Sequence, residues 1–169
     1  MNIIETTRTR LKPTAPEDLE FYRQLFADPV TTQYLPGDKP YDDQYIQNYV
    51  NNRVNHWQKG FGTFTVFTRS TTPEPMGYVG VETSPDLNHV DIRYGFLPKF
   101  GGQGFATEVG LACLDFMENL GMHKQVYGVA VSENEGSIAV LKKLGMEVAA
   151  NADFYGHPGL EYFVKTFRK

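Results

Sequence analysis

Two segments among the first sixty residues repeat apolar side chains at spacings of three and four positions, which is typical of amphipathic helices. The first segment begins after Thr14 and Glu17, whose spacing predicts a capping box, and should end near residues 28–29. The second can be capped by Asp42 or Asp43, and Gly60 is expected just past its C-terminal end. A weakly alternating strand over residues 8–12 is expected before them.

The middle of the chain alternates apolar and polar positions, which is typical of strands with one buried face. In the predicted strand His89–Leu97 the apolar residues fall on even positions, whereas Asp91 falls on an odd one. Its carboxylate is therefore expected opposite the apolar face. Two further strands are predicted over Phe61–Arg69 and Met76–Thr83.

The last third of the chain has the pattern of a crossover between strands. A helix is predicted from a glycine-rich turn to Leu120, followed by a strand at Gln125–Val131. That strand has almost no polar residue, so it should be central and parallel to a neighbour. A helix over Ser132–Leu144 and strands near Met146–Phe154 and Leu160–Phe167 complete the chain. We expect a single domain over residues 1–169.

Composition and charge exclude several classes of protein. The formal net charge is −4, which argues against a dedicated nucleic-acid-binding protein. Cys113 is the only cysteine and the four histidines are far apart in sequence, so neither an internal disulfide nor a metal site is expected. No apolar run approaches the roughly 18 residues of a membrane span, and the start of the chain lacks a signal-peptide pattern. We expect a cytoplasmic protein that does not bind membranes.

The most informative segment is the turn with Gly101, Gly102 and Gly104 between a strand and a helix. Glycines let a ligand approach the backbone, and the free N–H groups of a helix start favour an anion such as a phosphate. The segment lacks the Gly-Lys-Ser/Thr ending of a P-loop, and Thr107 stands where a dinucleotide fingerprint needs glycine. A simple tight turn remains the alternative.

A second segment, with Asn134 and Ser137 at a helix start and Lys143-Leu144-Gly145 at its end, lies at a characteristic distance from this loop. Together the two segments resemble the GNAT superfamily of acyl-CoA-dependent N-acetyltransferases. The run from Asp91 to Glu108 is similar, without a gap, to the branch that contains the ribosomal-protein N-terminal acetyltransferases.

The resemblance implies a mixed α/β (α+β) fold. Its central sheet would have six to seven mostly antiparallel strands with a splayed parallel pair, flanked by about four helices. It also implies acetyl-CoA as co-substrate, with no metal. By similarity, the backbone of Phe96 and Leu97 would pair with the pantetheine arm and Asn134 would bond to it. The pyrophosphate would lie on the residues at the start of the helix, namely Gly102, Gln103, Gly104, Phe105, Ala106 and Thr107.

The resemblance also implies direct attack of an amine on the thioester. Ser137 is expected to contact the leaving thiolate, the alternative being a serine that only bonds to a nearby backbone N–H. Asp91 is the candidate base, directly or through water, and Glu82 on the neighbouring strand is a second candidate. The alternative for Asp91 is a solvated or arginine-paired carboxylate, and either acid could instead bind a cationic amine. Many family members carry a general-acid tyrosine where this chain has Leu141, and an Arg, Gln or Trp where it has Gly101.

Two functions follow from these features. One is an N-acetyltransferase that acts on a primary amine, either a protein N-terminus or a small molecule. The alternative is an inactive CoA-binding sensor or interaction domain, and a domain of this fold with no CoA site is a third reading. Family members are often dimers, so a second copy of the chain is a candidate partner.

Overall fold

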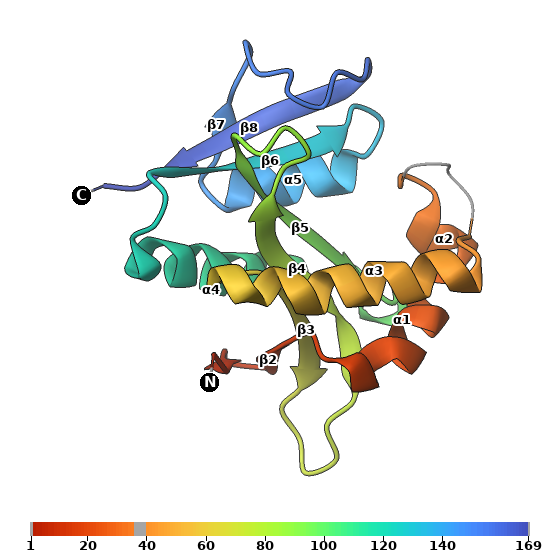
Figure 1. The fold of residues 1–169 in the computed structure, drawn as a ribbon. Coiled ribbons are helices and arrows are strands. Elements are labelled where there is room, and N and C mark those ends of the chain that lie inside the picture. Colours follow the sequence, from red (N-terminus) through yellow and green to blue (C-terminus); the bar gives the residue numbers. More distant parts are fainter. Residues whose placement is uncertain (1, 36–39, 169) are drawn as a thin grey trace.

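The computed structural model describes residues 2–35 and 40–168, whose strands form one mixed sheet (Figure 1). Its strand order is β1-β2-β3-β4-β5-β6-β8-β7. Every neighbouring pair is antiparallel except β5 and β6, which are parallel. The strands are β1 (Ile4–Glu5), β2 (Thr9–Pro13), β3 (Thr63–Thr68), β4 (Pro75–Thr83), β5 (Val90–Phe96), β6 (Gln125–Val131), β7 (Glu147–Val148) and β8 (Leu160–Thr166).

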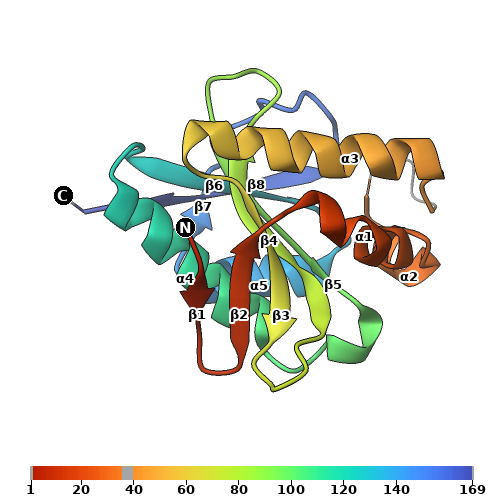
Figure 2. The same cartoon turned by 60° about the horizontal axis from the view of Figure 1, so that its bottom comes forward.

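Helices cover both faces of this sheet. α3 crosses one face (Figure 1), and α4 and α5 lie on the opposite side (Figure 2). α1 packs beside α3. The α-helices of the described residues are α1 (Leu19–Phe26), α2 (Pro29–Thr32), α3 (Asp43–His56), α4 (Phe105–Leu120) and α5 (Glu135–Lys143).

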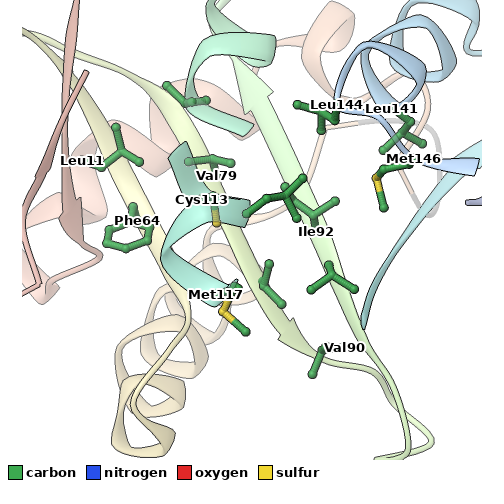
Figure 3. Close-up of a cluster of buried hydrophobic side chains, with 14 of the residues drawn as sticks. Leu11, Phe64, Val79, Val90, Ile92, Cys113, Met117, Leu141, Leu144 and Met146 are labelled. Carbon is green, nitrogen blue, oxygen red and sulfur yellow. The ribbon is translucent and has the colours of Figure 1, made fainter. Parts of the chain in front are cut away.

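The larger hydrophobic core lies between the sheet and the pair α4 and α5 (Figure 3). Cys113 and Met117 of α4 meet Val79 and Ile92 of the central strands there, and all four side chains are buried. A second core fills the other face, where α1 and α3 pack on Tyr78 of β4. Because both faces are covered, β4 is buried from Met76 to Glu82 and β5 from Val90 to Ile92.

The predicted mixed fold with one parallel pair is confirmed. The described residues form eight strands, where six to seven were expected, and five α-helices, where about four were expected. The additional strand β1 pairs with β2 at Ile4 and Glu5. The additional helix α2 begins at Pro29, where the first helix was expected to end, because Asp28 caps it through the N–H of Val30 (2.8 Å).

The predicted capping box at Thr14 and Glu17 is wrong by one residue. The N–H of Ala15 donates to Asp18 Oδ2 (2.9 Å) instead. The Thr14 hydroxyl is buried and lies 3.1 Å from the hydroxyl of Tyr22. Thr14 therefore joins the start of α1 to the sheet rather than capping the helix.

The strand predicted over Met146–Phe154 is also too long, because β7 contains only Glu147 and Val148. The N–H of Ala152 donates to the carbonyl of Ala149 (3.1 Å), so the chain turns there and leaves the sheet. Residues 149–159 then form a loop that returns to β8.

The central strand β5 has two unequal neighbours. It pairs with β4 at seven consecutive positions, from Gly77–Phe96 to Thr83–Val90. It pairs with β6 only at Asp91–Tyr127 and Ile92–Gly128. Beyond these two pairs β5 and β6 separate, as expected for a splayed parallel pair.

Candidate functional site

The glycine-rich turn follows the C-terminal end of β5, beside the separation of β5 from β6. A 3-10 turn at Pro98–Phe100 comes first, and the Gln103 side chain donates to the carbonyl of Lys99 (2.9 Å). Gly102 and Gly104 have φ angles of +71° and +82°. This left-handed region favours glycine, so both residues are required by the shape of the turn.

The start of α4 is open to an anion. Among the described residues no side chain caps this helix, whose N-cap is Gly104. Residues 101–104 are exposed, and a Cβ built on Gly102 would have no atom within 4 Å. The first N–H groups of a sixteen-residue helix and its dipole therefore face open space, which suits a phosphate group.

Glu108, the acidic residue in the first turn of α4, is paired with an arginine from the N-terminal part of the chain. Glu108 accepts from Arg8 Nε (2.7 Å) and from the hydroxyl of Thr6 (2.6 Å). The guanidinium of Arg8 also lies over the ring of Phe105, with Cζ 4.0 Å from the ring centroid. The negative charge of Glu108 is thus balanced by an arginine from the segment before β2, beside the glycine turn.

The backbone of β5 offers fewer free groups than expected at its end. The N–H of Leu97 donates to the carbonyl of Met76 (2.9 Å), and its carbonyl accepts from the N–H of Phe100 (3.0 Å). Both groups of Leu97 are therefore engaged. Because backbone groups alternate in direction along a strand, those of Tyr94 and Phe96 point to the opposite side, where β6 has separated.

Asn134 and Ser137 meet at the start of α5. Asn134 is the N-cap, and its Oδ1 accepts from the N–H of Ser137 (3.1 Å). The Ser137 hydroxyl does not bond to a backbone N–H of the described residues, but lies 3.0 Å from the hydroxyl of Tyr94. The tyrosine hydroxyl is also 3.0 Å from the carbonyl of Ser137, to which it can donate.

Asp91 and Glu82 are direct neighbours in adjacent strands, and both side chains are 2% exposed. Glu82 forms an ion pair with Arg53 of α3 (2.6 Å) and accepts from the hydroxyl of Thr63 (2.8 Å). Asp91 pairs with Arg93 Nε (3.0 Å), and Arg93 Nη1 lies 3.8 Å from Glu82. The two buried carboxylates and the two partly buried guanidinium groups form a charged cluster on the α3 face of the sheet.

Tyr155 fixes the loop of residues 149–159 to this cluster. Its hydroxyl donates to Asp91 Oδ2 and accepts from Arg93 Nη2 (3.2 Å). Burial raises the pKa of Tyr155, so the phenol remains protonated as the donor to Asp91. Its N–H donates to the hydroxyl of Tyr162 (3.0 Å), which anchors the loop to β8.

Sequence reasoning therefore found the glycine turn, the start of α5 and both carboxylates, but missed three of their partners. Arg53 lies between Val50 and Val54 on the packed side of α3, and a cation there is the only local signal of a buried acid. For Tyr94 the regular alternation of its strand predicted only a core position. Arg8 carries no signal that distinguishes it from other exposed arginines.

Two kinds of feature are absent from the described residues. No cluster of three or more His, Cys, Asp or Glu side chains within residues 2–35 and 40–168 is arranged to hold a metal ion. None of the helices in the same ranges has the length and apolar content needed to cross a membrane.

Comparisons with known proteins agree with this architecture. The chain is 28% identical over 168 residues to the uncharacterized protein YkkB of Bacillus subtilis, covering 96% of this chain and 95% of that one. An acetyltransferase structure from Agrobacterium tumefaciens superposes with a TM-score of 0.88 at 21% identity, over 99% and 95% of the two chains. The ribosomal-protein α-N-acetyltransferase RimL, solved in complex with coenzyme A, gives 0.81 at 16% identity over 98% of each chain.

The sequence itself matches a family description over most of its length. Residues 8–147 match the Acetyltransferase (GNAT) domain, and this range includes the glycine turn, the charged cluster and the start of α5. The chain therefore belongs to the GNAT family of acetyltransferases, whose members use acetyl-CoA.

Proposed function

We propose that the protein binds acetyl-CoA where β5 separates from β6 and transfers the acetyl group to a primary amine. The observation that carries this proposal is the open start of α4 beside the splayed strands. One feature offers N–H groups to a diphosphate and the other offers a strand edge to an extended chain. CoA contains both a diphosphate and an extended pantetheine arm.

The pyrophosphate would lie on the backbone of Gly102, Gln103 and Gly104 and on the first turn of α4, Phe105, Ala106 and Thr107. Residues 102–104 are exposed and 105–107 are half-exposed. This arrangement uses N–H groups rather than side chains, so it does not need the side chain that is missing at Gly101. The ion pair of Glu108 with Arg8 keeps the helix start from repelling the phosphates.

The pantetheine arm would pair with the edge of β5 through the backbone of Tyr94 and Phe96. Leu97 would lie beside the arm without bonding to it, because its N–H and its carbonyl both form hydrogen bonds within the chain. The amide nitrogen of Asn134 would donate to the arm, while its oxygen continues to cap α5. The thioester would then lie between β5 and the start of α5, close to Ser137.

In the reaction, the lone pair of the neutral amine forms the C–N bond and the C–S bond breaks, leaving its electron pair on sulfur. Ser137 would donate a hydrogen bond to this thiolate, and a β5 N–H would donate to the carbonyl oxygen. The amine must lose a proton, and Asp91 and Glu82 are the candidate acceptors, directly or through water. Each carboxylate is already paired with a guanidinium group. The proton could therefore leave through a chain of water molecules, or the carboxylates could serve to attract the amine.

The acceptor would approach from the α3 face, where the charged cluster lies beside the loop of residues 149–159. RimL, whose name describes α-N-acetylation of a ribosomal protein, has the same fold. A protein N-terminus is accordingly the first acceptor class to test, followed by small-molecule amines. Two buried acids and two partly buried arginines leave the cluster itself without net charge.

The test is a calorimetric titration of acetyl-CoA and of free CoA into the protein and into Gly104→Glu. Gly121→Glu is the matched control, because Gly121 has a similar φ of +71° at the opposite end of α4. We expect micromolar binding, lost in Gly104→Glu and retained in Gly121→Glu, with thermal melts showing that both variants fold. Equal binding by all three proteins would place the phosphates elsewhere, and no binding by the wild type would refute the proposal.

Transfer is tested separately by following the release of CoA thiol with a panel of peptides and small amines. Peptides with free and with blocked N-termini separate attack by the α-amine from attack by lysine. Ser137→Ala should lower kcat without weakening acetyl-CoA binding. Binding without transfer to any acceptor would support the alternative of a CoA-binding domain without catalysis.

A further inference from the structure

The hydroxyl of Tyr94 joins two elements at the proposed thioester position. The side chain extends from β5, and its oxygen lies 3.0 Å from Ser137 Oγ and 3.0 Å from the Ser137 carbonyl at the start of α5. Tyr94 is therefore the one phenol among the described residues with a hydrogen bond to Ser137. Its side chain is half-buried.

The residue one turn further along α5 cannot provide such a hydroxyl. Leu141 is 1% exposed and belongs to the main core. A Cβ built on Gly128 would lie 2.5 Å from Leu141 Cδ2, so this side chain packs directly against the middle of β6. A side chain at position 141 points into the core, whereas Tyr94 reaches the start of α5 from the neighbouring strand.

We propose that Tyr94 is a positioning residue that fixes the Ser137 hydroxyl so that its proton points at the sulfur of CoA. This inference rests on the proposed role of Ser137. The single proton of the phenol is shared between the Ser137 carbonyl and Ser137 Oγ, which lie at the same distance of 3.0 Å. The serine oxygen then accepts, and its own proton is free for a third partner. The backbone N–H of Ser137 donates to Asn134 Oδ1, so both the backbone and the side chain of this serine are held.

The protonation state of Tyr94 agrees with this role. Burial raises the pKa of Tyr94 to about 12, whereas an ordinary thiol has a pKa of about 8.5. The phenol therefore remains protonated while the CoA thiolate is present. Tyr94 orients and polarises the serine hydroxyl, and no proton needs to leave it during the reaction.

The consequence can be measured on the binary complex with free CoA, without any acceptor. A hydrogen bond to the thiolate stabilises the charged form and lowers the pKa of the bound CoA thiol. This pKa can be followed by the ultraviolet absorbance of the thiolate, as a difference from the protein without CoA. The chain's own Cys113 does not interfere, because burial raises its pKa to about 12.

The variants are Tyr94→Phe, Ser137→Ala and the double variant. We expect either single change to raise the pKa of the bound thiol by about half a unit to one unit, the range of one hydrogen bond. The double variant should show no further rise, because Tyr94 acts through Ser137. In turnover, kcat should fall about three- to tenfold in Tyr94→Phe with an unchanged KM for acetyl-CoA, since the thioester sulfur carries no charge.

Tyr127→Phe is the matched control, because the Tyr127 hydroxyl accepts only from the exposed amide of Gln125 (3.0 Å) among the described residues. It should leave the thiol pKa unchanged. A rise in Ser137→Ala but not in Tyr94→Phe would overturn the inference and keep the role of Ser137. No rise in either variant would refute both roles while CoA binding stands, and additive rises would show that Tyr94 acts independently. No CoA binding by the wild type would refute the proposed function and this inference together.

Discussion

Replacing Arg53 with methionine tests whether the charged cluster is held by its buried ion pair. Methionine keeps a straight side chain but removes the guanidinium that lies 2.6 Å from Glu82. The Arg53 and Glu82 side chains are 14% and 2% exposed. The exposed pair of Arg10 with Glu5 has the same 2.6 Å separation with side chains that are 40% and 44% exposed. Burial is therefore the variable that distinguishes the two pairs.

Removing one partner of a buried pair costs about 3–5 kcal/mol, because the other charge remains uncompensated. Glu82 would keep the Thr63 hydroxyl at 2.8 Å and the Arg93 guanidinium at 3.8 Å, so the low end of this range applies. We expect Arg53→Met to lose about 3 kcal/mol of unfolding free energy, or about 6–12 °C in Tm for a domain of this size. Arg10→Met should leave both quantities unchanged.

The assay is urea unfolding followed by tryptophan fluorescence. The single tryptophan, Trp57, donates from its indole nitrogen to the carbonyl of Thr63 (2.8 Å), so it reports on the contact between the end of α3 and β3. The two variants should unfold with the wild-type m value. An equally small change in Arg53→Met and Arg10→Met would show that Glu82 is solvated, and it would refute the description of the cluster as held by a buried ion pair.

Other changes have equally definite outcomes. Burial lowers the pKa of His56 from its ordinary 6.5, so the unfolded chain binds a proton at a higher pH than the folded chain does. The urea midpoint should therefore fall as the pH drops below about 6.5. It should fall less in His56→Gln. Gly80→Ala should lower the free energy of unfolding in urea by about 2 kcal/mol or more, because its Cβ would lie 2.3 Å from the backbone Cα of Thr63. The control Gly136→Ala in α5 should leave this free energy unchanged or raise it. Cys113 is 1% exposed with a raised pKa, so a thiol reagent should modify it only at the rate of unfolding; rapid labelling of the native protein would contradict its core position.

The periodic parts of the fold could be predicted from the sequence because each carries its own signal. Alternation placed β5 within one residue of its observed ends, and helical spacing identified α3 and α4. β1 and β7 contain two residues each, which is too short for a period, and their pairing depends on neighbours already in place. The capping error at Thr14 arose because its hydroxyl contacts the hydroxyl of Tyr22 instead, which only the folded chain brings near.

The site was predictable where its residues are close in sequence, as in the glycine turn and in the start of α5 at Asn134. It was not predictable where partners come from distant elements. Arg53 reaches Glu82 from α3, and Tyr155 reaches Asp91 from the loop before β8. The direction of backbone groups was also not predictable, because the spacing of residues does not reveal that the N–H of Leu97 faces β4.

The unequal pairing of β5 has a mechanical consequence. The N-terminal end of the chain lies in the part of the sheet formed by β1 to β5, and the C-terminal end follows β8 in the other part (Figure 1). A force applied to the two ends must pass across the junction of β5 and β6, which contains only two residue pairs. The two parts of the sheet should therefore slide apart as units before β4 and β5, joined at seven positions, are separated. An extended ligand bonded along the free edge of β5 would add contacts at this junction. The force needed to separate the two parts of the sheet should therefore rise on binding.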